Sequence, residues 1–98
     1  MKTISILPVA GDFPVDKDAA RELRLNTLLP SLQAGEAVEL DFAGISCATQ
    51  GFMHALLSDP IRQYPETVFD LILFKNCSDS VKEIVTAVAD YMFASLEA

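Results

Sequence analysis

From Val38 to Phe42 the chain alternates between apolar and acidic residues, and this pattern limits its fold more than any other feature. Alternation with a period of two is typical of a β-strand that buries one face and exposes the other. Helical patterns lie on both sides of it, at 16–32 and 49–58. A strand between two helices favours a sheet covered by helices. Because 98 residues suit one hydrophobic core, we expect a single domain over residues 1–98.

The segment before this strand predicts a first strand and a first helix. Thr3 to Val9 begins with alternation, and Pro8, which cannot donate a ladder hydrogen bond, places that strand near a sheet edge. Residues 13–15 are a candidate for a short return strand. A helix begins at Asp16 or Asp18 and runs to about Leu32. Its apolar stripe has helical spacing: Leu25, Leu28, Leu29 and Leu32.

Three residues mark irregular points of this helix. Pro30 lies inside the apolar stripe, so we expect the helix to kink or restart there. Leu23 lies on the far side of the helical wheel, where it either covers neighbouring chain or belongs to an interface. Gly35 suits the left-handed conformation that ends a helix.

The second half of the chain predicts two helices separated by a strand. Residues 49–58 form a short helix that we expect to end at Asp59-Pro60. Residues 68–74 are almost continuously apolar, which is typical of a central strand covered on both faces. The last helix is capped by Ser78, Asp79 or Ser80. Its apolar face is Val81, Ile84, Val85, Val88, Ala89 and Met92.

The order strand, helix, strand, helix, strand, helix predicts an α/β fold. Right-handed crossovers make successive strands of such a fold largely parallel. We therefore predict a central, mainly parallel sheet of three to four strands with helices packed on it. The predicted core is Ile6, Leu28, Leu40, Phe42, Phe52, Leu56, Leu71, Leu73, Ile84 and Val88.

Charge and composition exclude several functions. Seven basic against fourteen acidic residues give a net charge of −7, which disfavours nucleic acid and anionic lipid as partners. The N-terminal apolar stretch is too short for a signal peptide, and no run is long enough to span a membrane, so we expect a cytoplasmic protein. Two widely spaced cysteines and one histidine predict no disulfide scaffold and no metal site. Four dispersed glycines form no phosphate loop, and we expect no cofactor.

The order of several short segments resembles the STAS-like domains, small bacterial relatives of the sulfate-transporter and anti-sigma-factor-antagonist domain. In that family a buried strand like Val38–Ile45 leads through a loop, here Ser46–Gln50, into a helix whose apolar face begins with Phe, as Phe52 does. Leu71–Asn76 is similar to the next strand of the family and the Asn that follows it. Together with Ala20–Arg24 and the Gly35-Glu36 pair upstream, the resemblance covers roughly residues 16–96 and implies a STAS-like fold.

This resemblance implies a regulatory protein-interaction module without enzymatic activity. In the antagonist branch, a kinase that is also an anti-sigma factor phosphorylates a Ser in an Asp-Ser-Ser-Gly motif. The chain reads Ala48-Thr49-Gln50-Gly51 there, so Gln50 takes the phosphoacceptor position and Thr49 is the nearest hydroxyl. The implied partner is a histidine-kinase-type ATPase or an anti-sigma factor. The resemblance implies no catalytic, cofactor or metal residue.

The candidate partner-binding or phospho-switch residues lie on the loop and helix that follow the alternating strand. The loop supplies Ser46, and Thr49 stands where the helix begins. Gln50, His54 and Ser58 are four residues apart and predict one polar stripe facing outward, with Gly51 and Ala55 beside it leaving room for a partner backbone. The alternative is structural: Ser46 or Thr49 only caps the helix, and the stripe is its solvated side.

Two further interpretations remain open. Cys47 and Cys77 both follow strands, and ligands of open α/β sheets bind at that end, so a small enzyme or ligand-binding protein could use them together with His54. Buried cysteines that act as small apolar residues are the structural alternative. The second interpretation is a homodimer that pairs exposed sheet edges.

Overall fold

The structure, a computed structural model, describes residues 2–97 and shows a small α/β domain. Its sheet has three parallel strands in the order β1-β2-β3. The register places Ile4 opposite Leu40, and Leu40 opposite Phe74. In chain order the elements are β1 (Lys2–Ser5), α1 (Leu7–Ala10), α2 (Lys17–Leu23), the π-helical turn η1 (Arg24–Leu28), α3 (Leu29–Ala34), β2 (Val38–Asp41), α4 (Gln50–Gln63), α5 (Val68–Leu71), β3 (Ile72–Lys75) and α6 (Asp79–Glu97).

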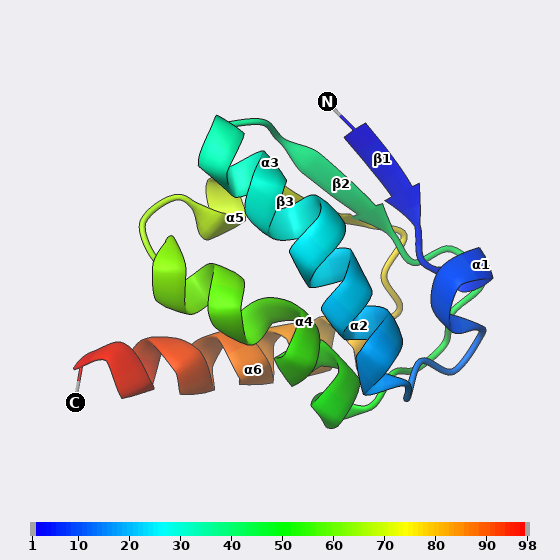
Figure 1. Cartoon of the computed structure of the whole chain (residues 1–98). Coiled ribbons are helices and arrows are strands. Elements are labelled where there is room, and N and C mark those ends of the chain that lie inside the picture. Colours follow the sequence, from blue (N-terminus) through cyan, green and yellow to red (C-terminus); the bar gives the residue numbers. More distant parts are fainter. Residues whose placement is uncertain (1, 98) are drawn as a thin grey trace.

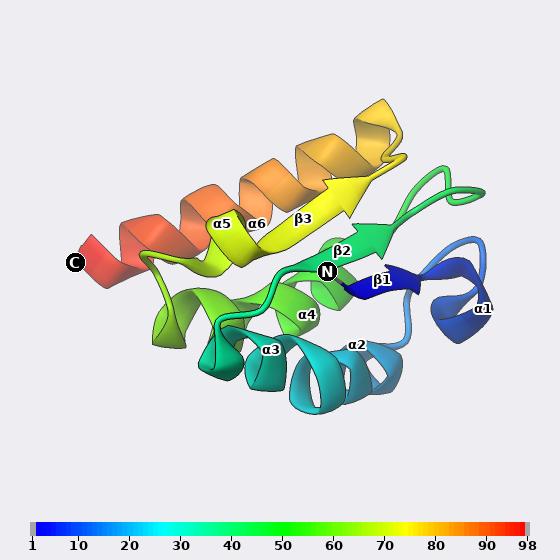
Figure 2. The same cartoon turned by 90° about the horizontal axis from the view of Figure 1, so that it is seen from above.

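The main helices lie on one face of the sheet (Figures 1 and 2). Both crossovers, from β1 to β2 and from β2 to β3, step in the same direction along the sheet. Because parallel crossovers are right-handed, two steps in one direction place their helices on the same side. Helix α4 packs between α2 and α6, as the residue contacts between these helices show. The domain therefore has two layers, with α2–α3, α4 and α6 beneath the sheet and the opposite face open.

The burial of the strand residues agrees with this two-layer arrangement. The alternating residues of the segment 38–42, β2 and the residue after it, divide as predicted: Val38, Leu40 and Phe42 are buried, whereas Glu39 and Asp41 are half-buried. The register aligns the outward residues across the sheet, so that Thr3, Glu39 and Leu73 form one row and Ser5, Asp41 and Lys75 the next. On this open face, the Thr3 hydroxyl donates to Glu39 Oε1 at 3.3 Å, and Lys75 Nζ lies 3.9 Å from the same oxygen.

The N-terminal segment differs from its prediction. The first strand ends at Ser5, and residues 7–10 form α1, in which Pro8 stands in the first turn. Proline is tolerated there because the first helical N–H groups have no intrahelical partner. Residues 13–15 form no strand. Instead, the carbonyl of Pro14 accepts hydrogen bonds from the backbone N–H of Thr49 at 3.0 Å and from its hydroxyl at 3.3 Å.

The first long helix contains a π-turn that the leucine pattern does not predict. Its cap is Asp16, whose carboxylate accepts from the N–H of Asp18 at 2.9 Å. The stripe prediction was wrong at Leu25, which is 46% exposed. Leu23, expected on the far side of the wheel, is only 7% exposed, so the alternative that it covers neighbouring chain is confirmed. In a π-turn each N–H reaches back five residues, so Leu23 and Leu28 occupy the same face although they are five residues apart. Leu23 thus covers the core.

The predicted restart at Pro30 is confirmed. Regular helix resumes at Leu29, with Pro30 in the first turn of α3. Gly35 ends that helix with φ of 72°, the left-handed conformation expected from the sequence.

Helix α4 continues through Pro60 to Gln63, so its predicted end at Asp59-Pro60 was wrong. Pro60 and Ile61 are buried, and this burial offsets the hydrogen bond that proline cannot donate. Arg24 of η1 stabilises the turn before the proline, because its Nη1 donates to the carbonyl of Ala55 at 2.8 Å and its Nε lies 3.4 Å from Asp59 Oδ2.

The apolar run at 68–74 is not a central strand. Its first part is the helical turn α5, in which Val68 is buried, and β3 begins only at Ile72. Strand β3 is an edge of the sheet, and Leu73 is 36% exposed on the open face. The run is almost continuously apolar because two different elements, a helical turn and a strand, each direct residues into the same core.

The final helix and most of the core agree with their predictions. Among the three candidate caps of α6, Ser78 is the one that caps it, since its Oγ accepts from the N–H of Val81 at 3.1 Å. Ile84 and Leu71 are half-buried against the core, and Leu73 is the member predicted incorrectly. The fully buried members of the predicted core are Ile6, Leu28, Leu40, Phe42, Phe52, Leu56 and Val88.

Candidate functional site

Thr49 fixes the start of α4 and is held in place from both sides. Its Oγ1 accepts from the N–H of Phe52 at 3.1 Å, and its hydroxyl and N–H both donate to Pro14. The structural interpretation of Thr49 as a helix cap is therefore confirmed. The side chain is half-buried, and its hydroxyl is already engaged as donor and acceptor.

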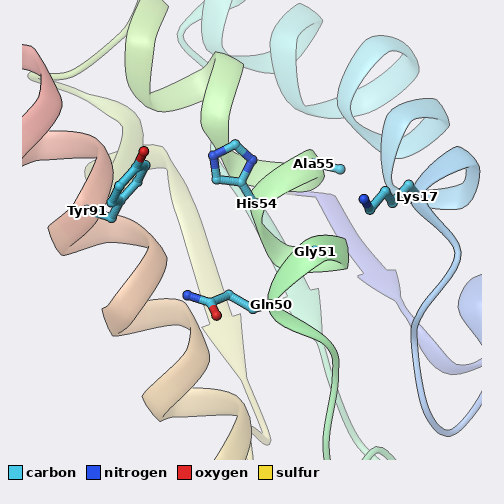
Figure 3. A pocket seen from close by; sticks show the side chains of 6 residues that line it. All are labelled: Lys17, Gln50, Gly51, His54, Ala55 and Tyr91. Carbon is cyan, nitrogen blue, oxygen red and sulfur yellow. The ribbon is translucent and has the colours of Figure 1, made fainter.

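A shallow groove crosses the N-terminal half of α4, with a volume of about 420 Å³ (Figure 3). Four residues of α4 line it: Gln50, Gly51, His54 and Ala55. Lys17 from the start of α2 and Tyr91 from α6 complete it on either side. The structure thus gathers Gln50 and His54 of the predicted stripe, with the two small residues beside them, at one depression between three helices.

The side chains around this groove follow from the packing of the helices. The His54 ring turns toward Tyr91 of α6, and the ring centroids lie 6.2 Å apart at an angle of 57°. On the other side, Cε of Lys17 lies 3.0 Å from the place where a Cβ on Gly51 would stand. Glycine at this position therefore leaves the space that the lysine stem occupies.

Two predicted surface residues do not line the groove. Ser58 is only 7% exposed, so the prediction that the whole stripe faces outward was wrong. Each step of four residues advances about 40° around an α-helix, so a third member of the stripe rotates toward the buried side. Ser46 is exposed in the loop before α4 and lines a different depression.

That second depression is a crevice of about 610 Å³ at the carboxyl ends of β2 and β3. Its lining comes from the two loops that follow these strands, at 43–46 and 76–78. The hydroxyl of Ser78 joins the loops by donating to the carbonyl of Ser46 at 2.6 Å. Cys77 lines this crevice, whereas His54 lines the groove on α4.

The surroundings of Cys77 do not activate it as a nucleophile. Partial burial raises the pKa of the Cys77 thiol, which keeps it protonated at neutral pH. Cys47 is half-buried, and the hydroxyl of Ser80 lies 3.4 Å from its sulfur. The two cysteines and His54 therefore do not form one constellation around a single depression.

At the same end of the sheet, Asp41 and Asn76 connect the ends of β2 and β3. Oδ1 of Asp41 accepts from Asn76 Nδ2 at 3.0 Å and from the N–H of Ala43 at 2.9 Å. These two hydrogen bonds lower the pKa of the Asp41 carboxyl. Asn76 has φ of 57°, a left-handed conformation that only a few residue types other than glycine adopt readily. The Asn76 side chain thus joins the loop after β3 to the end of the neighbouring strand β2.

The described residues, 2–97, include no group of three or more His, Cys, Asp or Glu side chains placed to hold a metal ion. None of the helices in this range is both long enough and apolar enough to cross a membrane.

The fold places the chain in a class of small α/β domains in which a parallel sheet carries helices on one face. Within that class, the model of a family described as "STAS-like domain of unknown function (DUF4325)" matches residues 19–82. The chain belongs to this family, as the order of its motifs indicated. No curated protein and no solved structure matches the chain.

Two residues of the groove were not predicted from the sequence. Lys17 follows the capping Asp16 and reads as an ordinary first-turn residue of a helix. Tyr91 could have been noticed in the sequence, because it is a large aromatic residue outside the predicted apolar face of the last helix. In the structure it is 63% exposed. An exposed aromatic residue on an amphipathic helix is typical of a binding surface.

Proposed function

We propose that this domain is a non-enzymatic regulatory module of the bacterial cytoplasm that binds a protein partner through the groove on α4. The groove itself carries the proposal. Ala55, with almost no side chain, allows a partner to approach the helix backbone closely beside the Lys17 stem, which occupies the space over Gly51. Tyr91 and His54 on one side and Lys17 on the other offer an aromatic surface and hydrogen-bond donors around that approach.

The partner class comes from the family resemblance. Antagonist-branch domains bind a histidine-kinase-type ATPase or an anti-sigma factor through the start of the corresponding helix, and the groove lies at that start. We therefore propose a partner of this class.

A phospho-switch has less support than partner binding. A phosphate on Thr49 would remove the hydrogen bond that its hydroxyl donates to the carbonyl of Pro14, and it would place negative charge beside that carbonyl. Ser46 is the exposed hydroxyl of the loop, but it lines the strand-end crevice and not the groove.

The alternative of an enzyme or small-ligand protein rests on the crevice at the ends of β2 and β3, where ligands of open α/β sheets bind. The raised pKa of Cys77 opposes a thiol nucleophile at neutral pH. We therefore favour the interaction module.

The test compares two substitutions that add the same charge. Ala55→Arg fills the groove, whereas Ala34→Arg places an arginine on an exposed position at the end of α3. Proteins captured from the native host by wild-type and variant domains are quantified by mass spectrometry, and circular dichroism checks that both variants fold. We expect Ala55→Arg to reduce capture of the specific partner at least about tenfold and Ala34→Arg to leave it unchanged. Equal capture by both variants contradicts the proposal.

A further inference from the structure

We infer that the groove on α4 binds an acidic side chain, Asp or Glu, from the partner polypeptide. This inference rests on the proposed function and names the chemistry of the partner segment. Lys17 brings a permanent positive charge to the groove. Gln50, His54 and Tyr91 each add a group that can donate a hydrogen bond.

The six residues that line the groove, all in the described part of the chain, include no carboxylate. The depressions beside it on α2 and α6 carry both signs of charge: one contains Asp18 and Glu22 with Arg21, and the other contains Glu83 and Asp90 with Lys82. An acidic segment therefore meets two carboxylates in each of those depressions, whereas the lining of the groove supplies Lys17 and no carboxylate.

The acidic residues adjacent in sequence do not line the groove. Asp18, next to Lys17, lines the depression on the outer side of α2, and Asp90, next to Tyr91, lines one on α6. Asp16 is occupied at the start of α2, where its carboxylate accepts from the N–H of Asp18. Lys17 points toward α4 (Figure 3), and the residues that line the groove with it include no carboxylate.

The small residues set the geometry of this interaction. Gly51 allows the Lys17 stem to lie against α4, with Cε 3.0 Å and Nζ 3.7 Å from the position of the missing Cβ. Lys17 points toward α4 from α2, and His54 lies on the side of α4 that faces α6 (Figure 3). A carboxylate that enters between Lys17 and His54 would approach both side chains, while the backbone that carries it lies over Ala55.

The first test uses isotope-labelled protein and two helical, alanine-based peptides that differ only in two residues one turn apart, Glu in one peptide and Gln in the other. Titration is followed by NMR chemical shifts. We expect the Glu peptide to shift the amides of Lys17, Gln50, His54 and Tyr91 and to bind about tenfold more tightly than the Gln peptide. Equal binding of the two peptides, or shifts centred on another surface, overturns the inference; so does the absence of any shift.

The second test uses matched charge reversals on the captured partner. Lys17→Glu reverses the charge in the groove and remains compatible with the first turn of a helix, where acidic residues are favourable. Lys82→Glu makes the same change on α6, where the lysine lines two other depressions, one of which also has no carboxylate in its lining. We expect Lys17→Glu to reduce capture about tenfold and Lys82→Glu to change it less than about twofold. If Ala55→Arg abolishes capture while Lys17→Glu does not, the groove is the interface and the acidic occupant is wrong. If neither reduces capture, both proposals fail.

Discussion

The two faces of the sheet use the same three strands but are stabilised differently. The closed face buries Val38 and Leu40 of β2, and Phe42 directly after it, against the helices, so its stability comes from apolar area. The open face carries polar residues and a few hydrogen bonds, concentrated where β2 and β3 end at Asp41 and Asn76. In this two-layer domain, most of the stabilisation thus comes from one face of the sheet, and substitutions on the other face are expected to affect stability less.

The largest expected effect tests the closed face. Phe42→Ala removes a fully buried ring that stacks on Phe74 with centroids 6.1 Å apart, and we expect it to lower the free energy of unfolding by about 3–5 kcal/mol. Leu73→Ala, on the open face, should cost less than about 1 kcal/mol. Urea denaturation of both variants measures the difference. Similar losses for the two would show that the faces are not as unequal as their burial indicates.

A smaller effect is expected where β3 ends on the open face. Asn76→Ala loses the hydrogen bond to Asp41 and places a Cβ-bearing residue without a polar side chain at positive φ, which together cost about 1–3 kcal/mol. Asn76→Gly loses the same hydrogen bond but accepts that φ freely. We therefore expect the glycine variant to be the more stable of the two in thermal denaturation. Equal stabilities would mean that the backbone conformation contributes nothing.

The smallest effect concerns pH. The pKa of Asp41 is lowered in the folded protein, chiefly by the hydrogen bond from Asn76, so its carboxylate favours folding above the unfolded pKa, near 3.8. This contribution is lost as the pH falls below that value and through the lower pKa of the folded state. We expect the stability difference between wild type and Asp41→Asn to shrink between pH 6 and about pH 2.5. A constant difference across that range, measured by urea denaturation, would contradict the role given to Asp41.

The sequence predicts an element of this fold correctly where the apolar residues of that element keep a single spacing, helical or alternating, along its whole length. Strand β2 and helix α6 each keep one period from end to end, and both were predicted with the correct buried face. The run at 68–74 mixes the turn α5 with the strand β3, and composition does not separate them. Nor does an apolar run show that its strand lies at an edge, because strand order is decided by how the helices pack.

The candidate site was predicted to a similar extent. Gln50, Gly51, His54 and Ala55 share one side of α4, so a helical wheel is enough to place them together. Lys17 and Tyr91 come from α2 and α6, and no local pattern indicates which helices flank α4. Ser58 was misplaced because a stripe of four-residue steps drifts around the helix.

The π-turn η1 has a consequence for aligning this domain with its relatives. The π-turn contains one residue more than a regular α-helical turn. The helical register of the residues up to Leu23 is therefore offset by one position from that of the residues from Leu28 onward. A relative with a regular α-helix at this place would need a one-residue gap between them. Without that gap, an alignment that is correct downstream of η1 assigns the buried role of Leu23 to Arg24, and the mismatch spreads to every position upstream.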